Sequence, residues 1–120
     1  MKIIHFNQAE HIKVAEKSTA HEYGVGESAI DSAFIEIDGA YPDNGKFAVN
    51  SVSKEILFVI AGAGVFEVKN KTGDIDVYEF GQHDVIFVDI GDIYRFNAQK
   101  AAFCVSCAPA WSPEQHQFVD

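Results

Sequence analysis

Basic residues are scarce in this 120-residue chain, where nine Lys and Arg stand against eighteen Asp and Glu and give a net charge of −9. Phosphate backbones and anionic lipid surfaces repel so acidic a chain, which argues against nucleic-acid and membrane-surface binding. No apolar run approaches the ~20 residues of a membrane span, and the early polar residues predict no signal peptide. With 48% hydrophobic residues, the composition predicts one globular domain with a real core.

Cysteine is equally rare, with only Cys104 and Cys107 in the chain. The flanking residues, 101–109, are typical of a β-strand, in which side chains three positions apart point to opposite faces. The pair is therefore badly placed to form a disulfide or to share one metal ion. We expect two small core thiols. Without a disulfide framework or a signal peptide, we expect the protein in the cytoplasm.

Short runs of aromatic and β-branched residues alternate with turn residues along most of the chain. This spacing is typical of an antiparallel sandwich or barrel. Gly62 and Gly64 are expected to end one of the strands, and Ser112–Gln115 predicts a short helical turn near the C-terminus. Residues 8–19 contain helix formers with weak apolar spacing, so a helix there has little support. The expected strands are 29–37, 47–52, 56–60, 65–69, 75–80, 85–88, 93–96 and 102–108.

Two segments resemble the conserved motifs of small single-domain cupins, the RmlC-like jelly rolls. In the first cupin motif, two histidines lead to a glutamate and then to a glycine, and Glu55 and Gly62 match the last two positions. The second motif contains a P-x-G turn before its histidine, and Gly91 matches the glycine of that turn. The resemblance implies an all-β jelly-roll barrel over residues 29–108, with an N-terminal arm at 1–28 and a C-terminal tail at 109–120, all in one cupin domain.

In cupins that bind a divalent metal, the two histidines, the glutamate and a later histidine are the ligands. Here the later histidine maps onto Tyr94, and only Glu55 keeps its family identity. One carboxylate with weak neutral donors does not make a tight transition-metal site, so the sequence predicts no metal and no other cofactor. The two remaining ligand positions map onto Val49 and Ser51 in one register and onto Ala48 and Asn50 in another.

Strand alternation and the resemblance together indicate which side chains face the barrel interior. Glu55 and Leu57 are expected inside, as are Tyr94 and Phe96, and Val49 and Ser51 by the same argument. Glu55 is either a ligand anchor or general base, or a structural hydrogen-bonding group, and Tyr94 is either a pocket donor or a space filler. The candidate ligand-binding residues are Glu55, Tyr94, Ser51, Asn50, Phe47, Leu57, Phe96 and Trp111, with Phe34 and Phe103 as further wall residues.

The five histidines lie outside the expected strands and are typical of surface residues. The alternative is that His83 or an N-terminal histidine folds over the barrel mouth and joins the site. Some metal-free cupins, the sugar-nucleotide epimerases and ketoisomerases, use histidine and tyrosine in the barrel for proton chemistry. This chain has the tyrosine but no evident barrel histidine, which weakens that reading.

The sequence therefore predicts a metal-free cupin that binds a small organic ligand, a sugar or a carboxylic-acid metabolite, in its barrel. One alternative is a metal-dependent isomerase resembling mannose-6-phosphate isomerase, or a dioxygenase, with displaced ligands. Another is a structural protein whose barrel is filled. Cupins of this size usually pair, so we expect a homodimer, with the N-terminal segment around Ile3 and Phe6 packing across the interface.

Overall fold

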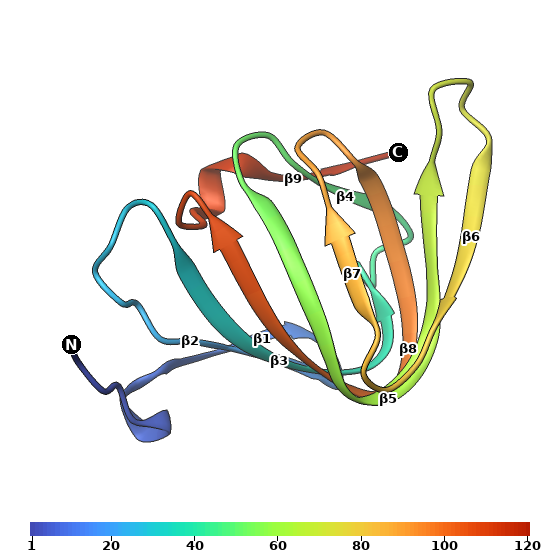
Figure 1. Cartoon of the computed structure of the whole chain (residues 1–120). Helices are drawn as coiled ribbons and strands as arrows, with labels where there is room; N and C mark the ends of the chain where they lie inside the picture. The colour runs from blue at the N-terminus through green and yellow to red at the C-terminus, as the bar shows by residue number, and fades with distance from the viewer.

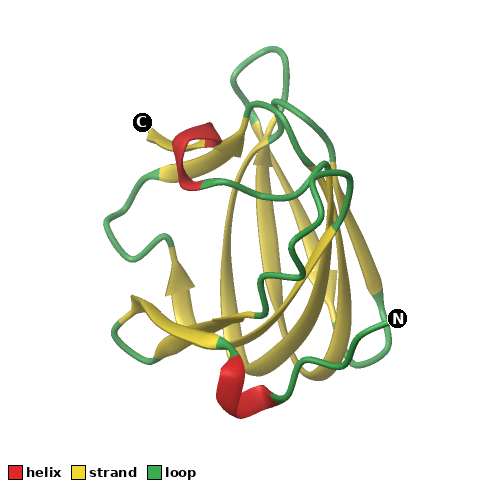
Figure 2. Cartoon of the chain, turned by 90° about the vertical axis from the view of Figure 1, so that its left-hand side faces the viewer, coloured by secondary structure: helices red, strands yellow, loops and turns green.

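The computed structural model describes residues 1–120, and nearly all of its regular structure is β-strand. The strands connect into one strongly curled sheet, which forms the predicted jelly-roll barrel (Figures 1 and 2). Two 3₁₀ turns, η1 (Phe6–Gln8) and η2 (Pro113–Gln115), are the only helical segments. The strands are β1 (Glu10–Ala15), β2 (Ser18–Glu22), β3 (Asp31–Tyr41), β4 (Phe47–Asn50), β5 (Lys54–Lys69), β6 (Ile75–Phe80), β7 (Val85–Val88), β8 (Ile93–Ala108) and β9 (His116–Val119).

Two long strands, β5 and β8, run antiparallel along their whole length and form the curved wall of the barrel (Figure 1). The expectation that Gly62 and Gly64 end a strand was wrong, because β5 continues through both. A Cβ atom at Gly62 would lie 2.5 Å from Ala101 Cα, and one at Gly64 would lie 2.3 Å from the Asn97 carbonyl oxygen. The two glycines therefore let β5 bend closely over β8 where a side chain would collide with its backbone.

Both ends of the chain add strands that the sequence did not predict. Residues 10–22 form the β1–β2 hairpin rather than a helix, and β2 pairs with β3, so part of the N-terminal arm extends the sheet. The predicted turn near the C-terminus is confirmed as η2. It leads into β9, which pairs with β4 and brings the tail back to the barrel.

The core lies inside the curl of the sheet and follows strand alternation. In β8, Phe103, Val105 and Cys107 are buried, whereas Cys104 and Ser106 are exposed. The opposite orientation of the two cysteines is thus confirmed, but the placement of Cys104 in the core was wrong because its side chain faces outward. No helix of the structure has the length and apolar character that a bilayer span requires.

Candidate functional site

A cavity of about 140 Å³ lies inside the barrel. Its walls are mainly apolar and come from the inner faces of β3, β5 and β8, with β1 and β2 on one side and the C-terminal tail on another. Five of the predicted site residues line it, namely Glu55, Leu57, Tyr94, Phe96 and Trp111, as does the predicted wall residue Phe103. The other lining residues are Val14, Ala20, Glu22, Asp31, Ser32, Ala33, Ile35, Ile37, Tyr41, Val105, Cys107 and His116.

Other predicted residues do not line the cavity. Ser51 is exposed, and Val49 is only half-buried, because the inward positions of β4 are Ala48 and Asn50. The register was wrong because the chain bends at residues 51–52 before β5 begins, so alternation does not carry across the bend.

The aromatic candidates Phe47 and Phe34 also lie elsewhere. Phe47 is buried beneath Lys69 and Arg95, whose cationic groups lie 4.6 and 4.5 Å from its ring centroid. Phe34 stacks on His21 outside the barrel. The expectation of both as site residues was wrong because each side chain points away from the cavity.

The carboxylate of Glu55 is the most buried acidic group of the site, with a residue exposure of 9%. Burial raises its pKa, while hydrogen bonds from Asn50 and Cys107 act in the opposite direction. Asn50 Nδ2 donates to Glu55 Oε1 at 3.0 Å, and the Cys107 thiol donates to the same oxygen at 3.6 Å. Burial, followed by the charge of Glu55, raises the pKa of Cys107, so this thiol stays protonated.

Asn50 is fully buried and connects Glu55 to the C-terminal tail. Its amide nitrogen faces the carboxylate, so its oxygen must face the tail. There Asn50 Oδ1 accepts hydrogen bonds from His116 Nδ1 at 2.7 Å and from Trp111 Nε1 at 3.4 Å. The indole is only a donor, which confirms this orientation of the amide. The N–H of the predicted turn glycine, Gly91, donates to the Asn50 carbonyl at 2.9 Å and holds the strand end in place.

His116 and Tyr41 form a hydrogen-bonded pair at the cavity wall. Asn50 Oδ1 can only accept, so His116 Nδ1 carries the proton, and Nε2 of the neutral ring is left as an acceptor. The Tyr41 hydroxyl, 2.7 Å away, therefore donates to His116 Nε2. Burial lowers the pKa of His116, and burial together with the charge of Glu55 raises the pKa of Tyr41. The resting pair is thus a neutral phenol and a neutral imidazole.

The buried side chain of Gln115 fixes the position of His116. Its Oε1 accepts from the backbone N–H groups of Val52 at 3.1 Å and Ser53 at 2.6 Å, and its Nε2 donates to Ser53 Oγ at 2.6 Å. Ser53 Oγ in turn donates to the Pro109 carbonyl at 2.8 Å. The tail is therefore bound to the β4–β5 connection directly before the histidine enters the site.

The sequence did not single out Tyr41, His116 or Cys107 as site residues. Tyr41 lies outside every expected strand and His116 was expected at the surface, and nothing in their local sequence signals that they meet. The alternative placement of His83 over the barrel mouth was also wrong, because this residue stacks on Phe58, an outward-facing residue. The imidazole that joins the site comes from the C-terminal tail instead.

Tyr94 lines the cavity and is almost completely buried. Burial, with a further contribution from the charge of Glu55, raises its pKa, so the phenol is neutral. The aromatic ring stacks on Phe66 with a centroid separation of 5.8 Å. The side chain thus fills space and also offers a hydroxyl on the cavity wall.

The residues at the cupin ligand positions do not fit a divalent metal. The structure selects the register in which these positions are Ala48, Asn50, Glu55 and Tyr94. Ala48 has no donor atom, both amide atoms of Asn50 are already hydrogen bonded, and Tyr94 is a neutral phenol. Glu55 is then the only anionic ligand, which is too few for a site of this type. No three His, Cys, Asp or Glu side chains are grouped closely enough to hold an ion.

No family model matches the sequence, and no curated protein matches it either. The structure, however, is similar to that of Streptomyces Pac13 with uridine, at a TM-score of 0.84 and 15% identity over 100% of this chain and 92% of that one. Another Pac13 structure, described as a nucleoside dehydratase, gives a TM-score of 0.83 at 15% identity over 99% and 91% of the two chains. The chain has a cupin fold.

Oxalate decarboxylase from Bacillus subtilis is also similar, at a TM-score of 0.76 and 15% identity. The match covers 95% of this chain and 31% of the decarboxylase. At such low identity the likeness establishes the cupin fold alone. The chemistry of the cavity has to be argued from the side chains that line it.

Proposed function

We propose that this chain binds a small neutral organic molecule of the sugar or nucleoside class in its barrel, without a metal ion. The observation that carries the proposal is the charge of the cavity wall. Glu22, Asp31 and Glu55 line the cavity, and no Lys or Arg does. A phosphate or carboxylate ligand would find no cation there and would be repelled by the carboxylates. The charge therefore favours the sugar over the carboxylic-acid metabolite among the predicted ligands.

The environment of Glu22 supports this reading. Its pKa is raised by burial and by the neighbouring charges of Glu10 and Asp31. Negative potential is thus concentrated at the side of the cavity formed by β2 and the start of β3. A neutral polyol can donate hydrogen bonds to these carboxylates without charge repulsion, whereas the charge of an anionic ligand is repelled by them.

The size and lining of the cavity suit one ring with polar substituents, which is a sugar or one of the two rings of a nucleoside. Cavities of about 150 Å³ hold a single six-membered ring, and the cavity here has about 140 Å³. Phe96, Phe103 and Trp111 offer aromatic walls, while the hydroxyls of Tyr41 and Tyr94 offer polar contacts. Apolar walls with a few placed polar groups are typical of small-molecule sites. The similarity to Pac13 structures that hold uridine, a neutral nucleoside, supports the same class.

The Tyr41–His116 pair equips the site for proton transfer. A ligand proton moves to the Tyr41 oxygen while the Tyr41 proton moves to His116 Nε2. The imidazolium so formed keeps its Nδ1–H on Asn50 Oδ1, and the reverse transfer restores both groups. Isomerisation and dehydration of hydroxylated substrates need this kind of reversible general base and acid. We therefore favour a proton-transfer enzyme over a passive binding module.

The two remaining alternatives receive less support. A metal-dependent isomerase or dioxygenase needs ligands that the four cupin positions do not supply. A structural protein with a filled barrel is less consistent with a cavity lined by two phenols, three carboxylates and an imidazole.

Matched ligand pairs test the proposal. We would measure binding of uridine against uridine 5′-monophosphate, and of glucose against glucose 6-phosphate, by ligand-observed NMR and calorimetry on tag-free protein. We expect the neutral member of a pair to bind and its phosphorylated partner to bind at least tenfold more weakly. Tighter binding of the phosphorylated member, or no binding by any neutral sugar or nucleoside in a wider panel, would refute the proposal.

Variants that remove one hydroxyl group test whether the ligand binds in this cavity. Loss of one hydrogen bond costs about 1 kcal/mol, or roughly fivefold in affinity. Tyr41→Phe and Tyr94→Phe should each lower affinity by about that factor. Tyr78→Phe is the matched control, because Tyr78 is 58% exposed on β6 and does not line this cavity. An equal loss in all three variants would place the ligand elsewhere.

A further inference from the structure

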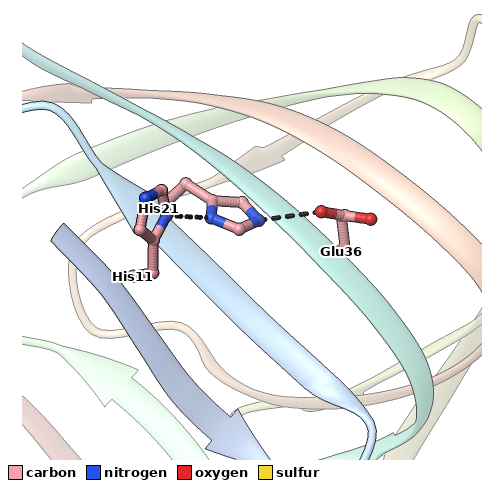
Figure 3. A network of polar contacts seen from close by, with 3 residues as sticks. All are labelled: His11, His21 and Glu36. Atoms are coloured by element: carbon pink, nitrogen blue, oxygen red, sulfur yellow. Dashed lines mark hydrogen bonds and ion pairs between the residues drawn. The ribbon is translucent and has the colours of Figure 1, made fainter. Parts of the chain in front are cut away.

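A second cluster of titratable side chains lies on the outer face of the sheet (Figure 3). His11 of β1 and His21 of β2 are directly opposite each other in the hairpin register. Their Nδ1 atoms are 2.7 Å apart, and His21 Nε2 lies 2.8 Å from Glu36 Oε1 on β3. Ala20 and Glu22, the neighbours of His21, line the barrel cavity. By strand alternation His21 points to the other side of the sheet, so this cluster is separate from the cavity.

The hydrogen bonds define where the protons are. The Glu36 carboxylate only accepts, so His21 Nε2 carries a proton and Nδ1 of the neutral ring has a free lone pair. That lone pair points at His11 Nδ1, which must donate the shared proton. Two ring nitrogens therefore converge on a single proton, which a metal ion bound by both nitrogens would replace.

The surroundings hold both rings in this arrangement. The Phe6 ring packs against both imidazoles, with centroid separations of 4.9 Å to each, and Phe34 stacks on His21 at 5.5 Å. His21 is buried, whereas His11 is exposed. The buried ligand is thus fixed, while the exposed one can adjust and leaves room for water.

We propose that His11 Nδ1 and His21 Nδ1 form a binding site for a divalent transition-metal ion, with Cu²⁺ bound most tightly. Imidazole suits copper, nickel and zinc, and affinity in this series is greatest for Cu²⁺. Bonds of about 2.0–2.1 Å to one ion need the two nitrogens about 3 Å apart with both lone pairs aimed at the ion. The exposed His11 ring therefore has to turn away from the line of the present hydrogen bond as well as move back slightly. His11 moves its proton from Nδ1 to Nε2 on binding, and no net proton is released.

Glu36 acts as a positioning residue in this site. A carboxylate that accepts the second N–H of a ligating histidine fixes the ring tautomer and raises its basicity. Two imidazoles are the only protein ligands, because no third His, Cys, Asp or Glu joins them. Water completes the coordination, so the ion can exchange.

Copper titration tests the site directly. We would titrate tag-free protein carrying Cys104→Ser with CuSO₄ at neutral pH, because Cys104 is an exposed thiol that would otherwise compete. Calorimetry should give one ion per chain, and electron paramagnetic resonance should show nitrogen ligation. His11→Ala, at an exposed position, should weaken binding at least tenfold. Glu36→Gln should weaken it about tenfold, the lower end of the range for such outer-shell partners.

Two control variants separate this site from other copper ligands. His5→Ala tests the N-terminal region, and His83→Ala tests an exposed histidine on another part of the surface. Both should keep the affinity and the spectrum of the parent protein. The proposal is overturned if His11→Ala binds copper as tightly as the parent, or if the parent binds none. Circular dichroism on each variant confirms that the fold is kept.

Discussion

At the scale of single residues, His116 is a neutral imidazole held between a donor and an acceptor. Burial lowers its pKa below the usual 6.5. The unfolded chain therefore binds a proton at higher pH than the folded chain does. The stability that neutral His116 contributes is complete above pH 6.5 and is lost as the pH falls through and below that value.

This pH dependence of stability predicts the effect of replacing His116 by glutamine. His116→Gln keeps an acceptor for Tyr41 and a donor for Asn50 but cannot titrate. We expect the free energy of unfolding of the wild type to fall more steeply between pH 7 and pH 5 than that of the variant, as measured by urea denaturation. His83→Gln, at an exposed position, should leave the pH dependence unchanged. A variant as pH-sensitive as the wild type would show that His116 titrates normally.

The pKa shift of Glu55 changes the stability of the fold with pH in the opposite direction to that of His116. Burial raises its pKa above 4.5, so the folded state binds more protons than the unfolded state between 4.5 and the raised value. The stability linked to protonated Glu55 is present at low pH and is lost as the pH rises through the folded-state pKa.

Glu55→Gln should remove the loss of stability that accompanies ionisation of Glu55. The amide oxygen can still accept from Asn50 Nδ2, and no charge is buried. We expect the variant to be more stable than the wild type at pH 7, with a smaller difference at pH 4.5, as measured by urea denaturation. Glu79→Gln, at an exposed position of β6, is the control. A large destabilisation at both pH values would mean that the carboxylate hydrogen bonds outweigh its burial.

The inward or outward direction of a side chain could be predicted from the sequence where the residue lies on the same strand as a cupin motif residue. Glu55, Leu57, Tyr94 and Phe96 lie inside the barrel as strand alternation and the cupin pattern indicated. Tyr41 and His116 could not be paired in this way, because 75 residues separate them and only the folded tail brings them together. The residue pair on which the proposed proton transfer depends is therefore visible in the structure and not in the sequence.

At the scale of elements, the bend of β5 depends on Gly62. This residue has φ +84°, and a Cβ there would lie 2.5 Å from both Ala101 Cα and the Lys100 carbonyl oxygen. Gly73 has a similar φ of +88° but no atom within 4 Å of a built Cβ. Substitution would therefore strain the backbone at both glycines, but only at Gly62 would the new side chain also collide with β8.

Alanine substitution at each position separates the free-energy cost of the positive φ from the cost of the collision with β8. Gly73→Ala should lose about 1 kcal/mol of unfolding free energy from the positive φ alone. Gly62→Ala should lose about 3 kcal/mol or more, because the β8 backbone must also move. Urea denaturation measures both. Equal losses would show that β8 gives way easily and that the close approach is not tight.

The elements that could be predicted were those with strong local patterns. The expected strands 75–80 and 85–88 coincide with β6 and β7. The β1–β2 hairpin was missed because its alanine, glutamate and lysine residues favour helix locally, while its strand state comes from pairing with β3. Long-range pairing overrides local preference at this edge of the sheet.

At the scale of the whole molecule, the outer face of β5 and β7 carries a group of exposed apolar side chains. Phe87 pairs with Ile56, and Val85 pairs with Phe58, which in turn lies opposite the exposed Cys104 of β8. Val85 is 59% exposed and Phe87 56%. Contiguous apolar surface of this kind usually marks an interaction site. None of these five residues is charged, so a second copy can approach here despite the net charge of −9.

We predict that the homodimer forms through this face and not, as the sequence suggested, through the N-terminal segment, whose Phe6 packs against His11 and His21 of its own chain. Light scattering should give about 26 kDa, twice the 13.2 kDa of one chain. Phe58→Glu and Phe87→Glu would each place two like charges in the interface and should give the monomer mass. Val52→Glu, an exposed apolar residue in the β4–β5 connection, should leave the mass unchanged.

The exposed Cys104 thiol should react with a thiol reagent faster in the monomeric variants, because the partner covers it in the dimer. A wild-type mass of about 13 kDa at micromolar concentration would contradict the pairing, and faster labelling without a change of mass would indicate local unfolding instead.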